Sequence, residues 1–329
     1  MINIIIPAAG VGTRLRPHTH SAPKALLQVA GKPILGHILD RLTKLEQRGT
    51  ISLVVGFLAE QIENYVRSNH PELDVRFVYQ SDLRGLGYAI HLALEDIPGN
   101  GPVLVILGDT IVDIDLAAFM EDGHDSLGVK EVEDPRRFGV VEVENGLIRR
   151  LVEKPADPPS NLAVVGLYGI NSTALLRECL REVVTRDQRA RGELQMTDAL
   201  QLMVERGSRM HARTVDGWYD CGKLETLLLT NRHLLEQMQK VYQLPDSVVI
   251  NPSYVAPSAK VERCIIGPYV SIGDRAEVSE SILVNTIVSN DAEVRRCVLE
   301  DSMIGSNAAV SGHVQRLNVG DSSEIGIFD

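Results

Sequence analysis

The first third of the chain alternates short apolar runs with amphipathic stretches. The apolar runs, rich in valine and isoleucine, predict β-strands at Ile2–Ile6, Ile51–Gly56, Val75–Gln80 and Val103–Leu107. Apolar positions at helical spacing between them predict helices over Ile34–Arg48, Glu60–Asn69 and Tyr88–Asp96. This alternation is typical of a parallel sheet with right-handed crossovers, in which ligands bind beyond the carboxyl ends of the strands.

The next part of the chain has a less regular pattern. From Ser126 to Ile170 it predicts several short strands joined by turns. Two amphipathic stretches then predict helices over Thr173–Thr185 and Gln195–Arg206. A short strand, Met210–Val215, and a last helix, Leu224–Lys240, close this part of the chain.

After Pro245 the apolar positions recur every six residues, which fits neither a helix nor a simple paired strand. Three lines of such positions are Ile266, Ile272, Val278 and Val284; Val270, Ala276, Ile282, Val288 and Val294; and Val298, Ile304 and Val310. A six-residue repeat predicts a parallel β-helix, with roughly eighteen residues per coil and about four coils. We therefore expect two domains, residues 1–243 and residues 244–329.

Composition and charge narrow the choice of partners. The 329 residues carry a formal net charge of −11, and aromatic residues make up only 4%. This acidity argues against DNA or an anionic membrane surface, and the scarcity of aromatic residues argues against single-stranded nucleic acid. We expect no nucleic-acid or membrane partner. The four cysteines are widely spaced, and we see no apolar run of transmembrane length and no signal peptide, so we expect a cytoplasmic protein with reduced thiols.

Candidate chemistry begins directly after the first predicted strand. The loop there contains Gly10 and Gly12, and glycines let backbone N–H groups turn toward an anion. The spacing matches neither the ATPase phosphate loop nor the dinucleotide fingerprint, and a plain tight turn would also explain the two glycines. His18 and His20 lie in the same segment and could contact a ligand. Every charged side chain before Asp40 is a cation, which favours a phosphate site: Arg14, Arg16, Lys24 and Lys32.

Two further strand ends carry polar side chains. Asp109 follows the predicted strand Val103–Leu107 and could cap the turn at Thr110 or bind Mg²⁺, which takes one or two carboxylates plus phosphate oxygens. Asp220, in the segment Trp-Tyr-Asp-Cys-Gly, could supply the second carboxylate. Gln80 ends the third predicted strand. Its amide offers a donor beside an acceptor, which suits the edge of uracil or thymine, although an exposed glutamine is usually only a surface residue.

The first segment resembles the sugar-1-phosphate nucleotidylyltransferases, whose signature reads GxGTRLxP…PKxLL…xKP. The matching residues are Gly10, Gly12, Thr13, Arg14, Leu15, Pro17, Pro23, Lys24, Leu26, Leu27, Lys32 and Pro33. The resemblance implies an α/β fold: a Rossmann-like mixed-sheet nucleotidyltransferase domain followed by a left-handed parallel β-helix that often mediates oligomer contacts. It also implies Mg²⁺-dependent transfer of a nucleotidyl group from dTTP or UTP to glucose-1-phosphate or a related hexose-1-phosphate.

The resemblance further implies roles for individual residues. Arg14 and Lys24 would be catalytic, and Asp109 and Asp220 would bind the metal. The nucleotide would contact Ala9, Gly10, Gly12, Thr13, Gln80 and Gly85. The sugar phosphate would contact Gly139, Glu153, Lys154 and Val164, although the adjacent Glu153 and Lys154 could also be a solvated charge pair. The segment 191–198 matches the family as well, and we expect it to be structural.

Several alternatives stay open. The chain is most similar to the longer glucose-1-phosphate thymidylyltransferases, but it departs from them at Ala9 and Cys221. The uridylyltransferases tolerate both residues, so the choice between thymidylyl and uridylyl transfer is undecided. Gln80 disfavours guanylyl or adenylyl transfer. A non-catalytic regulatory or assembly subunit that binds a nucleotide sugar is a rival of another class. Acyl transfer by the β-helix would have His313 as its one candidate base.

Overall fold

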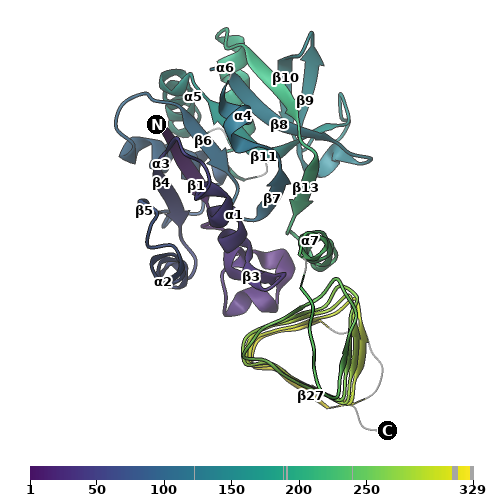
Figure 1. The fold of residues 1–329 in the computed structure, drawn as a ribbon. Coiled ribbons are helices and arrows are strands. Elements are labelled where there is room, and N and C mark those ends of the chain that lie inside the picture. Colours follow the sequence, from purple (N-terminus) through teal and green to yellow (C-terminus); the bar gives the residue numbers. More distant parts are fainter. Residues whose placement is uncertain (122, 188, 190–191, 239, 313–317, 327–329) are drawn as a thin grey trace. The chain divides into compact units, whose positions relative to one another are not determined.

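A computed structural model describes residues 1–121, 123–187, 189, 192–238, 240–312 and 318–326 (Figure 1). The chain divides into two compact units. The first unit contains Met1–Gly10 and Ile38–Trp218, and the second contains Val11–His37 and Tyr219–Asp329. The expected domain boundary near residue 243 stays a prediction. Over the described ranges, every helix is too short or too polar to cross a membrane.

The first unit is built on a nine-stranded mixed sheet in the order β5-β4-β1-β6-β11-β8-β12-β10-β9. Its first four strands are parallel, as predicted, and β11 then runs antiparallel to β6. The strands in chain order are β1 (Ile2–Pro7), β4 (Arg48–Val55), β5 (Val75–Tyr79), β6 (Val103–Ile106), β8 (Asp125–Glu131), β9 (Gly139–Glu144), β10 (Leu147–Glu153), β11 (Leu162–Ile170) and β12 (Met210–Thr214). The carboxyl ends of the parallel strands therefore share one edge of the sheet.

Helices cover this sheet with apolar faces that match their sequence pattern. The core contains Ile90 of α3, Leu180 of α5 and Leu200 of α6, all fully buried together with sheet residues such as Val105. The helices and the remaining short strand of this part are α1 (Ile34–Leu42), α2 (Ala59–Asn69), α3 (Leu86–Asp96), β7 (Thr110–Asp113), α4 (Leu116–Glu121), α5 (Thr173–Thr185) and α6 (Met196–Glu205).

Three predicted helix boundaries were wrong. The first helix ends at Leu42 rather than Arg48, and Arg48 begins β4 instead. The Arg48 guanidinium donates to the carbonyl oxygens of Thr43 (2.9 Å) and Leu45 (3.3 Å), so it caps the carbonyls that follow the helix. Helix α3 begins two residues early, at Leu86, and α7 (Leu224–Glu236) ends four residues early.

The second unit contains a β-helix whose three sides are parallel sheets (Figure 1). One side consists of β14 (Val248–Val249), β17 (Ile265–Ile266), β20 (Ile282–Val284) and β23 (Val298–Glu300). The second consists of β15 (Tyr254–Val255), β18 (Ser271–Ile272), β21 (Ile287–Val288), β24 (Met303–Ile304) and β26 (Asn318–Val319). The third consists of β16 (Lys260–Glu262), β19 (Glu277–Ser279), β22 (Glu293–Arg295), β25 (Ala309–Ser311) and β27 (Glu324–Gly326). The predicted repeat architecture is confirmed as stacked parallel strands.

The coils are shorter than the predicted eighteen residues. One coil advances by 17 residues, from Lys260 to Glu277, and the next by 16, from Glu277 to Glu293. Non-glycine corner residues with positive φ recur every five or six residues and mark the shorter sides: Arg263, Tyr269, Arg275, Glu280, Asn285, Asp291, Arg296, Asp301 and Asn307. A five-residue side shifts which positions point inward.

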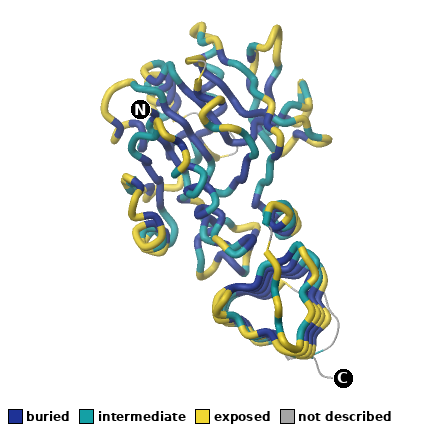
Figure 2. The backbone as a smooth tube through the Cα atoms, in the orientation of Figure 1, coloured by how far each residue is buried: buried dark blue, intermediate teal, exposed yellow. Residues whose placement is uncertain are grey.

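Figure 2 shows that buried and exposed positions alternate around the β-helix. The shift overturns part of the predicted core. Leu283 is fully buried, whereas Val284, one of the predicted inward positions, is only partly buried. Ile282 and Val298 also fail the six-residue pattern, because they are 40% and 38% exposed. The remaining predicted positions, such as Ile272 and Val294, are buried.

We predict that the two neighbouring residues differ sharply in their effect on stability. Leu283→Ala removes a fully buried side chain and should lower the free energy of unfolding by about 2–4 kcal/mol. Val284→Ala should cost less than about 1 kcal/mol, because its side chain is partly solvated already. Thermal and urea unfolding of the two variants measures both values. Equal losses would contradict the coil register.

Candidate functional site

The cationic signature segment lies in the second unit and folds as three short 3₁₀ turns, Thr13–Leu15, His18–His20 and Lys24–Leu26. Gly12 has φ = 68°, and a Cβ atom added there would lie 3.0 Å from Cβ of Lys24 and 3.1 Å from Cγ2 of Thr19. The Thr19 hydroxyl donates to the Gly12 carbonyl at 2.9 Å. Gly12 is therefore required both by its backbone conformation and by the close packing of Lys24.

The two predicted catalytic cations, Lys24 and Arg14, differ in their exposure to solvent. Lys24 is only 9% exposed, whereas Arg14 and the neighbouring Thr13 are exposed. A largely buried ammonium group interacts more strongly with a nearby anion than a solvated one. An exposed guanidinium stays available to a ligand and can contact phosphate oxygens with two donors. The segment thus offers one desolvated and one solvated cation.

The predicted nucleobase residues meet where the parallel strands of the first unit end. Gln80 N donates to the Val55 carbonyl of the neighbouring strand at 2.8 Å, and Gln80 is 4% exposed. A Cβ atom added at Gly56 would lie 3.0 Å from both Cβ of Ala9 and the Gln80 carbonyl oxygen. The structure therefore brings Ala9 and Gln80 together around Gly56, and Gln80 is not the exposed surface residue of the alternative reading.

Gly85 completes this group. The Gln80 side-chain amide donates to the Gly85 carbonyl at 3.3 Å. Gly85 has φ = 109°, and an added Cβ atom would lie 2.7 Å from the Leu194 carbonyl oxygen. Gly87 N also donates to the Leu194 carbonyl at 2.8 Å. The glycines at the start of α3 thus allow the segment around Leu194 to pack directly against the residues predicted to bind the nucleobase.

The predicted sugar-phosphate residues also gather in the first unit. Glu153 pairs with Gly139 across β10 and β9. A Cβ atom added at Gly139 would lie 3.2 Å from Oε2 of Glu153 and 3.7 Å from Cγ2 of Val164. Lys154 Nζ lies 3.0 Å from Oε1 of Glu153, and Lys154 has a positive φ of 44°. Because only 12% of the Glu153 side chain is exposed, this pair is not the fully solvated charge pair of the alternative reading.

Three polar residues of this region were not singled out as site residues from the sequence. The Thr197 hydroxyl donates to Oε2 of Glu153 at 3.0 Å, and Thr197 is buried. Burial and then the charge of Glu153 raise the pKa of the Asp198 carboxyl. Burial also raises the pKa of the Tyr168 phenol, and the charges of Glu153 and Asp109 raise it further. Thr197 of the matched segment thus contacts Glu153. The family match over this segment was the sequence signal for Thr197 and Asp198.

The two predicted metal ligands lie in different units, so the structure describes each one separately. Asp109 follows β6 and is partly exposed, and its Oδ1 accepts from the Thr110 hydroxyl at 3.2 Å. In the second unit, a Cβ atom added at Gly222 would lie 2.8 Å from Oδ2 of Asp220, so glycine leaves room for this carboxylate. Among the described residues no group of three or more histidine, cysteine, aspartate or glutamate side chains could hold a metal by itself. Mg²⁺ takes one or two protein carboxylates and its other ligands from phosphate and water, so each aspartate by itself has the chemistry of a magnesium ligand.

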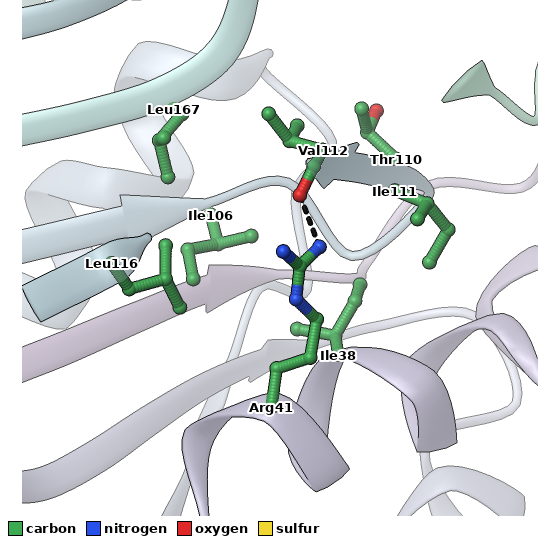
Figure 3. A pocket seen from close by; sticks show the side chains of 8 residues that line it. All are labelled: Ile38, Arg41, Ile106, Thr110, Ile111, Val112, Leu116 and Leu167. Atoms are coloured by element: carbon green, nitrogen blue, oxygen red, sulfur yellow. Dashed lines mark hydrogen bonds between the residues drawn. The ribbon is translucent and has the colours of Figure 1, made fainter. Parts of the chain in front are cut away.

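A small pocket lies beneath β7 in the first unit (Figure 3). Arg41 of α1 enters it and donates to the carbonyl oxygens of Val112 and Ile114, the latter at 3.1 Å. Burial lowers the pKa of Arg41, and the Asp113 carboxylate partly opposes this shift. The pocket volume of about 20 Å³ leaves room for roughly one water molecule, which is too little for a nucleotide or a sugar.

The histidines singled out in the sequence do not gather at one site. His18 is 1% exposed, and its Nε2 atom is hydrogen-bonded to Oδ1 of Asn318, so it faces the β-helix. Burial lowers the pKa of His18, whereas the contact with Asn318 and the charge of Asp321 raise it. His20 is exposed. His313, the one candidate base for acyl transfer, lies outside the described residues.

The chain is similar to several known proteins. A family model described as nucleotidyl transferase matches residues 3–237. The chain is 28% identical to the low-salt glycan biosynthesis nucleotidyltransferase Agl11 of Haloferax volcanii, over 98% of this chain and 99% of that protein. It is 30% identical to a glucose-1-phosphate thymidylyltransferase of Streptomyces griseus, over 97% and 98%. A solved UDP-glucose pyrophosphorylase in complex with UDP-glucose superimposes with a TM-score of 0.63 and 27% identity, over 72% of this chain and 100% of that chain.

We predict that Asp198 makes stability depend on pH. Its Oδ2 atom is buried and has no hydrogen-bond partner among the described residues. Since its pKa is raised in the folded state, the group favours folding below the unfolded-state pKa of about 4, and this contribution is lost as the pH rises through the folded-state value.

Asp198→Asn replaces the carboxyl group by a neutral amide and so removes the loss of stability at high pH. The variant should therefore melt at the same temperature as the wild-type protein near pH 3.5 and about 1–3 °C higher near pH 8. The increase is small because the carboxyl group is partly solvated. Calorimetric melting temperatures across this range test the prediction, and an advantage of the variant that grows toward low pH would refute it.

Proposed function

Because the chain belongs to the nucleotidyl transferase family, we propose that it transfers a thymidylyl or uridylyl group to glucose-1-phosphate or a closely related hexose-1-phosphate. The products are a nucleoside diphosphate sugar and pyrophosphate. The observation that carries this proposal is the segment Leu194–Thr197. Its first residue packs on Gly85 and Gly87 beside Gln80, and its last donates a hydrogen bond to Glu153. Three residues of chain span at most about 10 Å, and α6 begins at Met196, so the two contacts lie close enough for one ligand to reach both with its base and its sugar.

The proposed reaction is a direct in-line displacement. An oxygen of the sugar phosphate forms a bond to the α-phosphorus, and the bond from that phosphorus to the bridging β-phosphate oxygen breaks. The electron pair leaves with pyrophosphate, so no enzyme nucleophile is needed. Both reactants are anions that repel each other, and catalysis therefore consists of positioning and charge stabilisation.

The cations of the signature segment supply that stabilisation in the proposed mechanism. Arg14 is exposed and can bind phosphate oxygens of the triphosphate and of the leaving pyrophosphate with two donors. Lys24, packed over Gly12, acts as a point charge near the α-phosphate. Gly10, Gly12 and Thr13 present backbone groups to the same phosphates.

Asp109 and Asp220 hold the metal in this proposal. Mg²⁺, when bound, neutralises phosphate charge and orients the reacting oxygens. Lys154 pairs with the sugar phosphate, and Glu153 accepts hydrogen bonds from the sugar hydroxyls. Gly139 and Val164 contact the sugar through their backbone.

Gln80 favours a pyrimidine in this proposal. Its buried amide can present one donor and one acceptor to the N–H and C=O groups of thymine or uracil. Guanylyl or adenylyl transfer would require a different edge. Thymidylyl and uridylyl transfer are both consistent with this amide, so the assay below includes both triphosphates.

The rival function is a non-catalytic subunit that binds a nucleotide sugar. Such a subunit would have no need for the metal carboxylates or the signature lysine. This chain retains Arg14, Lys24, Asp109 and Asp220. A subunit of that kind would bind the nucleotide sugar without releasing pyrophosphate, so one assay separates the two functions.

We predict pyrophosphate release only with a pyrimidine triphosphate, a hexose-1-phosphate and Mg²⁺ together. Purified protein is incubated with each of dTTP, UTP, GTP and ATP against a panel of sugar-1-phosphates, and pyrophosphate is measured by a coupled assay. Lys24→Ala and Asp109→Asn should each lower turnover about 100-fold or more, because each removes a preorganised charge. A chelator should abolish turnover.

Lys44→Ala is the matched control, since Lys44 is an exposed lysine outside the signature. It should leave turnover unchanged. Near-normal turnover of Lys24→Ala would refute the catalytic assignment. Nucleotide-sugar binding without any pyrophosphate release would favour the non-catalytic subunit.

We further propose that the β-helix is left-handed, that it joins copies of this chain and that the protein acts in the cytoplasm, where its proposed substrates are made. An apolar ladder on one side of the β-helix supports the second point. Val248, Ile265, Ile282 and Val298 are paired in register on successive coils, and they are 59%, 41%, 40% and 38% exposed. A continuous exposed apolar row of this kind is typical of an interaction surface.

We predict that charges on this ladder reduce the size of the oligomer. The double variant Ile265→Glu, Ile282→Glu places two carboxylates on neighbouring coils and should give a smaller mass in light scattering. Arg295→Glu changes a charge on another side of the β-helix and serves as the control, with no effect on mass. An unchanged mass of the double variant would exclude this ladder as the interface.

A further inference from the structure

Asn231 of α7 is a fully buried polar side chain that joins three segments of the second unit. Its Oδ1 atom accepts from the backbone N–H of Ala30 at 2.8 Å and from the hydroxyl of Ser271 at 2.7 Å. Its Nδ2 atom donates to the Tyr269 carbonyl at 3.2 Å. Ala30 belongs to the signature segment, and Tyr269 and Ser271 belong to the β-helix. One amide therefore links α7, the signature segment and the β-helix.

Ala30 lies at the tip of a hairpin formed by β2 (Gln28–Val29) and β3 (Lys32–Pro33). Ala30 and Gly31 both have positive φ, 48° and 82°, as a tight two-residue hairpin turn requires. A Cβ atom added at Gly31 would lie 2.4 Å from the ring of Tyr254 in the β-helix. The hairpin tip is thus fixed against the β-helix by a close apolar contact and by the Asn231 amide.

Thr230, the residue before Asn231 in α7, contacts the segment that contains Asp220. The Cys221 thiol lies 3.4 Å from the Thr230 hydroxyl, to which it donates, and Thr230 donates in turn to the Thr226 carbonyl at 2.8 Å. Thr230 is fully buried, and Cys221 directly follows Asp220. Adjacent residues of α7 therefore contact the segment of the proposed metal ligand and the segment of the proposed catalytic lysine.

We propose that Asn231 is a positioning residue, through which the β-helix and α7 fix the signature hairpin and with it Lys24. This inference rests on the proposed function of Lys24. The turn at Lys24 ends at Leu27, whose backbone N–H donates to the Lys24 carbonyl at 3.1 Å, and β2 begins at the next residue. A displacement of the hairpin tip is therefore transmitted to Lys24 through a short, hydrogen-bonded stretch of chain.

The chemistry of the site requires an amide. Its oxygen accepts two hydrogen bonds, and its nitrogen donates one to a carbonyl oxygen. An apolar side chain of similar size would leave the Ala30 N–H and the Tyr269 carbonyl without this partner, and such groups rearrange to find another. A shift of about 1 Å in a catalytic group can lower turnover about 100-fold.

The test compares three variants of the full-length chain. Asn231→Leu removes all three hydrogen bonds, and Ser271→Ala removes only the one from the β-helix hydroxyl. Ser302→Ala is the matched control, because Ser302 is also a buried β-helix serine, but its hydroxyl donates to the Glu300 carbonyl at 2.7 Å. For each variant we measure kcat, the KM for both substrates, and amide hydrogen exchange at Leu26, Leu27 and Ala30.

Asn231→Leu should lower kcat about 10- to 100-fold while each KM changes less than about threefold, and exchange at the three amides should accelerate at least about tenfold. Ser271→Ala should change both quantities in the same direction by less, and Ser302→Ala should change neither. Exchange in β6 of the first unit should stay constant in all three variants. This pattern separates positioning of the hairpin from a general loss of stability.

Unchanged exchange at Leu26 and Leu27 in Asn231→Leu would overturn the inference, and so would an equal effect of Ser302→Ala. If Asn231→Leu does not fold, Ser271→Ala decides the outcome by the same two measurements. Exchange also separates this inference from the proposed function. A wild-type protein without nucleotidyl transfer would refute the function, whereas the exchange rates would still show whether Asn231 fixes the hairpin.

Discussion

The close approach of the parallel strands at their carboxyl ends is the constraint on which the site of the first unit depends. A Cβ atom at Gly56 would meet Ala9 and Gln80 at 3.0 Å, and one at Gly108 would meet the Pro7 carbonyl at 2.9 Å. Real Cβ contacts are essentially never shorter than 3.0 Å and seldom as short as 3.0 Å, so Gly108 needs glycine and Gly56 favours it. Because no side chain separates the strand ends, Ala9, Gln80 and Asp109 emerge at one edge of the sheet, where open α/β sheets bind ligands.

A second constraint connects that edge with the residues proposed to bind the sugar. The chain from Leu194 to Thr197 is fixed at both ends, by backbone contacts to Gly85 and Gly87 and by the hydroxyl contact to Glu153. Glu153 is mostly buried and is held by both Lys154 and Thr197. A partly buried carboxylate with two partners keeps one orientation, as the proposed recognition of sugar hydroxyls requires. Burial, and then the charge of Glu153, raise the pKa of the nearby Asp198 carboxyl.

The sequence predicted most of this arrangement wherever the signal is local. Apolar periodicity placed the parallel strands and α5, and the signature and its matches identified the segments now seen around Gly12, Gln80 and Glu153. Features that depend on a single side-chain contact, on the exact coil length or on distant partners could not be predicted in this way. The end of α1 depends on Arg48, and the burial of Leu283 instead of Val284 depends on a five-residue side of a coil. Asn231 lies in an ordinary amphipathic helix, and its partners, 201 and 40 residues away, give it no local signal.

The two units divide the chemistry between them. The first contains the groups proposed to recognise the base and the sugar, which are held by glycine contacts and buried side chains. The second contains the proposed phosphate cations, in a segment that folds as three short 3₁₀ turns and, over its described residues, contains no long helix or strand before α1. Such a segment has little intrinsic rigidity, so its geometry must come from what it packs against. Within this unit it packs against the β-helix at Pro17, His18 and Gly31 and against α7 at Ala30. A stack of coils joined by backbone hydrogen bonds is a stiff support, and this gives the β-helix a physical role in the proposed catalysis that does not depend on a ligand site of its own.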